Sequence, residues 1–267
     1  MSAITIGFSP CPNDTFIFNA LISGEIDTDG LRFEPVLADV ETLNEWALQE
    51  KLDVTKLSYP AFFRVQKNYG LLSAGSALGV GVGPLLVTGT SVEHLKNEIE
   101  NAVIALPGIN TTANFLFQYA YPNAKKKVFI PFNEIEDFTL NNVGSFGVLI
   151  HENRFTYLQK CLHLVKDLGT HWEASTGVPI PLGCIAVHKR LGHEMPSRVD
   201  RLIRKSLEHA WKKYPDLPEY VKVNAQELDE KIMRSHIELY VNDYTLDLGE
   251  RGRKAVATMG KILSGGY

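Results

Sequence analysis

The sequence has few cysteines, no long hydrophobic run and no large excess of either charge. Its three cysteines, Cys11, Cys161 and Cys184, are odd in number and show no Cys-x-x-Cys spacing. This pattern argues against a disulfide framework and a structural zinc site, and it predicts reduced thiols. The chain has 27 basic and 31 acidic residues, and its longest basic run is the lysine triplet at 125–127. We therefore expect no nucleic-acid partner.

The N-terminal segment does not have the pattern of an export signal. Residues 1–8 contain neither a basic stretch nor the apolar segment of about 7 to 15 residues that a secretory signal carries. No apolar run approaches the roughly 20 residues that a membrane-spanning helix needs. We therefore expect a soluble, cytoplasmic protein with no membrane partner.

Strands and helices alternate along the chain. The 267 residues, 45% of them hydrophobic, are enough for two modest domains. Apolar runs at 3–8, 31–37, 53–58, 102–106 and 142–150 predict strands, with helices between most of them. Such alternation is typical of α/β domains built on parallel sheets.

Polar residues follow the first and third predicted strands. Ser9 stands after the first strand, and Asn13 or Asp14 is the expected N-cap of the helix that follows. Lys56 and Ser58 end the third strand, immediately before a predicted helix that begins at a Tyr-Pro pair. Both junctions therefore place polar groups at the carboxyl end of a strand.

The next two junctions have the same character. Thr111 and Thr112 occupy the cap region after the strand at 102–106, where hydroxyl and free N–H groups can hold a carboxylate. His151 ends the strand at 142–150. A helix is predicted at 154–168, where four apolar residues recur at i, i+3, i+7 and i+10. Taken alone, His151 is either a structural histidine or a catalytic base.

Two crossings between α/β units organise the chain. We expect a first, larger domain at 1–88 and 182–267 and a second, smaller one at 89–181, with a new unit beginning at Glu93 and crossovers near 85–91 and 178–184. An α/β domain inserted in another resembles the two-lobed fold of periplasmic binding proteins. In that arrangement the four junctions converge on one interdomain cleft, which is the usual place for a ligand.

Several common kinds of site are not indicated. The glycine-rich segment at 75–84 leads into a strand and matches no nucleotide-binding loop, and no serine has a Gly-x-Ser-x-Gly context. His188 and His193 are five apart across a glycine, so they do not form a helical metal-ligand pair, and no metal site is expected. Cys11, between two prolines, is either a nucleophile or a packed thiol.

The junction segments together carry a family resemblance that covers essentially the whole chain. The segments are Ser-Pro-Cys-Pro-Asn-Asp-Thr-Phe at 9–16, Lys-Leu-Ser at 56–58, Gly-Ile-Asn-Thr-Thr at 108–112, Gly-Val-Leu-Ile-His-Glu-Asn-Arg-Phe at 147–155 and the stretch 240–249. With them the chain resembles the 1,4-dihydroxy-6-naphthoate synthases of the futalosine route to menaquinone. Chorismate dehydratase of the same route shares the fold, and the His-Glu-Asn-Arg-Phe element favours the synthase.

This resemblance implies a specific activity. It predicts a cofactor-free carbon–carbon lyase that converts cyclic dehypoxanthinyl futalosine into 1,4-dihydroxy-6-naphthoate and releases dihydroxyacetone, with His151 as the general base. The small-molecule carboxylate substrate is expected to be bound by Ser9, Asn13, Lys56, Leu57, Ser58, Thr111 and Thr112. Two alternatives remain open: chorismate dehydratase, and a non-catalytic protein that encloses a small anion. The sequence does not indicate an oligomeric state.

Overall fold

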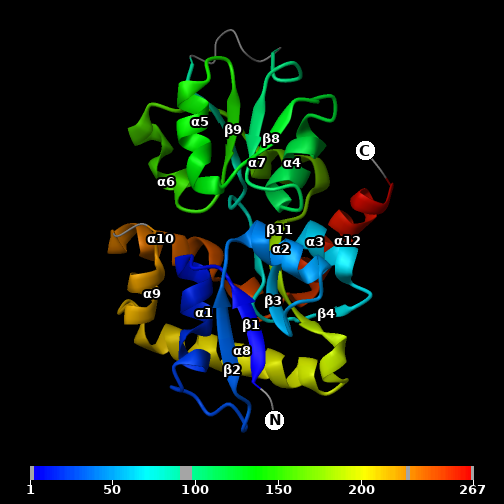
Figure 1. Ribbon diagram of the computed structural model, residues 1–267, viewed down its shortest axis with the longest axis vertical. Coiled ribbons are helices and arrows are strands. Elements are labelled where there is room, and N and C mark those ends of the chain that lie inside the picture. Colours follow the sequence, from blue (N-terminus) through cyan, green and yellow to red (C-terminus); the bar gives the residue numbers. More distant parts are fainter. Residues whose placement is uncertain (1–2, 91–97, 227–228, 266–267) are drawn as a thin grey trace.

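Two β-sheets occupy opposite halves of the molecule (Figure 1). The computed structural model describes residues 3–90, 98–226 and 229–265. The expected start of the second α/β unit, at Glu93, lies outside these residues. Within the described part of the chain, no helix has the length and apolar character that crossing a membrane requires.

The first sheet contains strands from two distant parts of the chain. Its order is β2-β1-β3-β11-β4, and β5 also pairs with β11. Strands β1 and β2 run parallel, as do β1 and β3, while β11 is antiparallel to β3. The strands are β1 (Ile4–Phe8), β2 (Phe33–Leu37), β3 (Val54–Ser58), β4 (Tyr69–Leu71), β5 (Ala77–Gly79) and β11 (Ile180–His188).

The second sheet is built from the middle of the chain, in the order β10-β6-β9-β7-β8. Strand β7 is parallel to β8 and β9, whereas β6 is antiparallel to β9 and β10. Strand β6 therefore pairs in the second sheet, although the expected boundary at residue 88 assigned it to the first domain. The strands are β6 (Leu85–Thr88), β7 (Ile104–Leu106), β8 (Lys127–Phe129), β9 (Phe146–Leu149) and β10 (His163–Asp167).

Helices cover both sheets, and those near the C-terminus pack with the first one (Figure 1). The helices are α1 (Pro12–Ile22), α2 (Val40–Leu48), α3 (Tyr59–Val65), α4 (Thr112–Ala120), α5 (Ile135–Asn141), α6 (Asn153–Thr156), α7 (Leu168–Thr176), α8 (Met195–Lys213), α9 (Glu219–Asn224), α10 (Glu230–Tyr240), α11 (Asp243–Leu246) and α12 (Gly249–Gly265). Short 3₁₀ turns lie at Phe132–Glu134, Tyr157–Lys160 and Lys189–Leu191.

One apolar cluster joins the two halves. It includes Leu57 and Tyr59 from the first half and Leu106, Phe117 and Trp172 from the second, all nearly inaccessible to solvent. All five residues of β3 are buried, as expected for a strand covered on both faces. The ends of β3 and β7 are therefore held by packing on either side of the junction between the halves.

The prediction of a single helix at 154–168 is wrong in its second half. Helix α6 ends at Thr156, and the 3₁₀ turn that follows stops at Cys161, whose left-handed φ of 56° ends the helical backbone. The following residues form β10, which pairs antiparallel with β6. Leu158, expected on the buried face, is 69% exposed. Local apolar spacing was overridden by strand pairing with a segment far away in the sequence.

Cap residues were partly predicted. For the helix after the strand at 31–37, the sequence predicts Asp39 or Glu41 as the cap. Asp39 caps α2 by accepting hydrogen bonds from the Glu41 and Thr42 N–H groups. The expectation of Asn13 or Asp14 as the cap of α1 is wrong. Cys11 occupies the cap position without a side-chain hydrogen bond, because Pro12 already begins the helix. Asn13 and Asp14 therefore lie in the first turn, and their side chains are available for other contacts.

Candidate active site

A cavity of about 100 Å³ lies where β1, β3, β7 and β9 lead into the segments that follow them. Its walls come from both halves of the molecule and from α10. It is lined by Ser9, Asn13, Asp14, Val40, Lys56, Leu57, Ser58, Ala77, Val82, Pro84, Thr111, Thr112, Ala113, Ile150, His151, Leu182, Gly183, His236 and Tyr240. All eight site residues predicted from the sequence are among them.

Lys56 turns inward and forms a buried ion pair. Its Nζ lies 2.7 Å from Asp14 Oδ1, with both side chains at most 6% exposed, and it also donates to the Gly75 carbonyl. The other Asp14 oxygen accepts from the Ser9 backbone N–H and hydroxyl, and Asn13 donates to Oδ1. The lysine charge is thus balanced inside the protein, and this wall of the cavity is held by several charge-assisted hydrogen bonds.

The predicted site residues with hydroxyl groups differ in the hydrogen bonds that these groups already make within the protein. Ser58 Oγ accepts from Asn44 Nδ2 at 3.1 Å. Thr111 caps α4: its hydroxyl donates to the Gly108 carbonyl and accepts from the Asn114 N–H. Thr112 donates to Leu182, across to β11. Both threonine hydroxyls therefore donate to backbone carbonyls, which makes the N–H groups at the start of α4 the more accessible donors on this wall.

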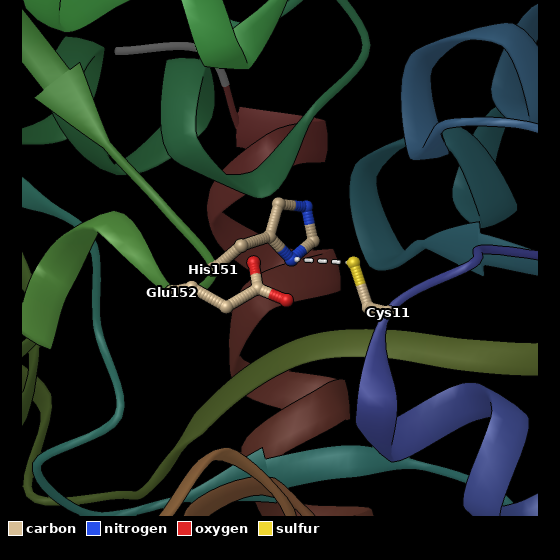
Figure 2. Close-up of side chains that lie close together, drawn as sticks. All are labelled: Cys11, His151 and Glu152. Carbon is tan, nitrogen blue, oxygen red and sulfur yellow. Dashed lines mark hydrogen bonds between the residues drawn. The ribbon is translucent and has the colours of Figure 1, made fainter. Parts of the chain in front are cut away.

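His151 lies in the break between β9 and α6. Its φ of 55° is left-handed, a conformation that is uncommon outside glycine and often occurs at functional sites. Its Nδ1 contacts Cys11 Sγ at 3.4 Å, and the Glu152 carboxylate lies beside the same nitrogen (Figure 2). The contact joins residues 140 positions apart and brings the N-cap of α1 against the segment that follows β9.

His236 and Tyr240, both on α10, were not named as site residues by the sequence analysis. The His236 ring stacks on His151 with ring centroids 6.3 Å apart. Neither His236 nitrogen has a hydrogen-bond partner among the described residues. The available signal was the spacing of Met233, His236, Ile237 and Tyr240, which places His236 on the buried face of an amphipathic helix.

Burial keeps both histidines neutral. It lowers the pKa of His151, an effect that the nearby Glu152 and Asp14 carboxylates oppose. Burial lowers the pKa of His236 further below its usual value, helped by His151 and two cationic side chains. Near neutral pH each ring thus has an unprotonated nitrogen that can accept a proton.

The Cys11 thiol is also neutral. Burial, reinforced by Glu152, raises its pKa well above the ordinary value. Since the thiolate is the nucleophilic form, this environment disfavours covalent catalysis by Cys11. Of the two roles left open by the sequence, a packed thiol is the one that this environment supports.

Contacts outside the cavity tie the two halves together. Glu41, in the first turn of α2, accepts hydrogen bonds from the backbone and side-chain N–H groups of Asn110 at 3.0 and 2.8 Å. Arg154 donates to the carbonyls of Gly81 and Gly83, next to β6. These contacts connect segments that surround the cavity.

Comparison with known proteins identifies the family. Residues 4–264 match the sequence profile of a family described as menaquinone biosynthesis. The chain belongs to this family. A 1,4-dihydroxy-6-naphthoate synthase of Thermus thermophilus is 42% identical over 97% of this chain and 93% of its own length. A synthase of the same name from Streptomyces coelicolor is 38% identical over 96% and 92%. The resemblance inferred from the junction segments is thereby confirmed.

Solved structures confirm the fold. A crystal structure of a protein from Archaeoglobus fulgidus has a TM-score of 0.91 at 31% identity and covers 98% of this chain and 97% of its own. The periplasmic aliphatic sulphonate binding protein of Escherichia coli has a TM-score of 0.67 at 8% identity, over 99% and 87%. The family fold is thus the two-sheet α/β fold of periplasmic binding proteins, as expected from the order of elements.

Proposed function

We propose that this protein is a carbon–carbon lyase that converts cyclic dehypoxanthinyl futalosine into 1,4-dihydroxy-6-naphthoate with release of dihydroxyacetone. Membership of the menaquinone biosynthesis family supports the route. The observation that carries the chemistry is a half-buried, neutral His151 in a cavity whose walls come from four strand ends. A binding protein that only encloses an anion has no need of an unprotonated imidazole at that place.

His151 is the proposed general base. Cleaving a carbon–carbon bond beside a carbonyl begins with removal of a proton and formation of an enolate. When Nδ1 carries the ring proton and donates it toward Cys11 Sγ, Nε2 keeps the lone pair that accepts the substrate proton. We assign the base to His151 rather than His236 because the Cys11 contact orients the His151 ring, whereas neither nitrogen of His236 is held by a described residue.

The start of α4 is the proposed carboxylate site. The backbone N–H groups of Thr112 and Ala113 lie in the first turn, and both residues line the cavity. The positive end of a helix dipole and free N–H donors favour a negative group. Lys56 and Ser58 then bind hydroxyl or carbonyl oxygens of the substrate and stabilise the enolate as it forms. The charge of Lys56 is balanced by its ion pair with Asp14.

The two halves are proposed to be domains that close over the substrate. The strands of the first sheet come from 4–79 and 180–188, and those of the second from 85–167, which supports a division at the two predicted crossovers. The first boundary is placed before β6 rather than at residue 88, and the second before β11 rather than at residue 181. The cavity is small beside the roughly 300 Å³ or more of typical ligand sites. Opening therefore precedes substrate entry, and identical small-angle scattering profiles with and without saturating ligand would contradict closure.

One assay tests the reaction. The purified protein is incubated separately with cyclic dehypoxanthinyl futalosine and with chorismate, and products are followed by mass spectrometry. We expect 1,4-dihydroxy-6-naphthoate and dihydroxyacetone from the first compound and no turnover of the second. Dehydration of chorismate alone would assign the protein to the neighbouring activity. Ligand-induced thermal stabilisation without any product would make it a binding protein.

A further inference from the structure

Three side chains with metal-binding atoms meet at the edge of the cavity. One ligand atom each of Cys11, His151 and Glu152 lies within 4.8 Å of the others (Figure 2). Cys11 and Glu152 are buried, at 4% and 6% exposure, beside His151, which lines the cavity. Sulfur, imidazole nitrogen and carboxylate oxygen are the three atom types from which proteins build zinc sites. No metal site was expected from the sequence, because its cysteine and histidine spacings match no local ligand motif; Cys11 and His151 are 140 positions apart.

An unsatisfied atom points to a ligand at this place. Glu152 Oε1 is buried and has no hydrogen-bond partner among the described residues. A buried carboxylate oxygen without a partner is costly, and in native proteins it usually marks a missing water, ion or ligand. A cation held between Glu152, Cys11 and His151 supplies that partner.

We propose that Cys11, His151 and Glu152 form an inhibitory site for Zn²⁺. Zinc–sulfur and zinc–nitrogen bonds of about 2.3 and 2.0–2.1 Å place the two ligand atoms about 3.6 Å apart at a tetrahedral centre. The separation of Cys11 Sγ and His151 Nδ1 is 3.4 Å. Rotation of the Glu152 side chain brings its oxygen to the third position, and a water takes the fourth. Binding deprotonates the thiol, so one proton is released for each metal ion bound.

Zinc bound at His151 Nδ1 would prevent His151 from acting as the general base. This consequence rests on the proposed function. A neutral imidazole has one nitrogen with a lone pair and one N–H group. When zinc takes the lone pair of Nδ1, the proton must reside on Nε2, so neither nitrogen can accept a proton from substrate. Zinc therefore inhibits the lyase without entering the carboxylate site at α4.

Binding is tested with CoCl₂, a spectroscopic substitute for zinc, on the purified protein. We expect one cobalt ion per chain with a near-ultraviolet thiolate-to-cobalt charge-transfer band. Cys11→Ser should abolish the band. Glu152→Gln should weaken ZnCl₂ affinity by at least about 10- to 100-fold, because a loss of that size is found even for groups that only hydrogen-bond to a metal ligand. Cys161→Ser is the control, because Cys161 is the exposed free cysteine. A band that survives Cys11→Ser, or disappears with Cys161→Ser, overturns the site.

Turnover assays distinguish a failure of the inhibitory zinc site from a failure of the proposed lyase function. Micromolar ZnCl₂ should inhibit the wild-type lyase, EDTA should restore turnover, and the residual activity of Cys11→Ser should resist zinc. Cobalt binding through Cys11 with unchanged turnover would overturn the inhibitory role. Near-normal turnover of a folded His151→Asn variant would instead remove the base, and the cobalt spectra would still decide whether the metal site exists. Circular dichroism melting curves establish folding for every variant.

Discussion

Two walls of the cavity differ in how their polar groups are satisfied. On one wall Ser9, Asp14 and Lys56 form a network in which each side chain has a hydrogen-bond partner. On the other, here called the histidine wall (His151 and His236, with Glu152 beside His151), Glu152 Oε1 and both His236 nitrogens lack partners among the described residues. A satisfied network holds a shape, whereas unsatisfied buried groups cost stability and are retained where they serve a ligand or a reaction.

The largest effect is expected from removing the base on the histidine wall. His151→Asn should lower kcat by about 10²- to 10⁴-fold, the usual contribution of a positioned base. Asparagine tolerates the left-handed backbone at this position, so the melting temperature should change little. The matched control is His163→Asn, since His163 is exposed on β10. Steady-state kinetics with the cyclic futalosine substrate measure the effect, and a loss below tenfold would contradict the assignment.

A stability measurement addresses the satisfied wall. Lys56→Met leaves the Asp14 charge buried without its cation, and we expect a loss of about 3–5 kcal/mol in the free energy of unfolding. The double variant Lys56→Met/Asp14→Leu removes both charges and should recover most of that loss. Urea denaturation followed by fluorescence compares the three proteins. A double variant as unstable as the single one would show that the ion pair is not the cause.

A smaller effect is expected where a hydroxyl contacts substrate without holding the fold. Ser58→Ala should raise KM by about 3- to 10-fold with little change in kcat, as for loss of one neutral hydrogen bond. Asn44 keeps its hydrogen bond to Glu41, so stability should be maintained. Thr258→Ala is a control, since its hydroxyl donates to the Lys254 carbonyl within α12. A KM equal to that of the control would count against Ser58 as a binding residue.

The smallest effect concerns pH. Burial places the folded-state pKa of His236 below the value of about 6.5 in the unfolded chain. Between these two values the unfolded chain binds the extra proton, so the free energy of unfolding falls as pH drops below about 6.5. His236→Phe should reduce this dependence, at most by about 1.4 kcal/mol per pH unit. Denaturation curves from pH 7.5 to 5 measure it, and equal slopes in both proteins would refute the assignment.

The junctions between strands and helices could be predicted because their signals are local. The Asp39 and Thr111 caps use backbone groups within three residues of the capping side chain, so short segments contain the whole interaction. The eight predicted site residues lie at such junctions, and all line one cavity. The same reasoning failed at 154–168, where β10 depends on its partner strand β6 rather than on its own spacing.

By itself, the sequence determined the α/β alternation, the family and the strand ends that carry the site, since strand pattern, caps and motifs are properties of short segments. Only the tertiary structure decided which groups meet there. It brought Cys11 against His151, paired Lys56 with Asp14 and placed His236 over the cavity from α10. The first two of these contacts join residues 140 and 42 positions apart. Because burial and neighbouring charges set each pKa, the chemistry of the site depends on packing that no local pattern specifies.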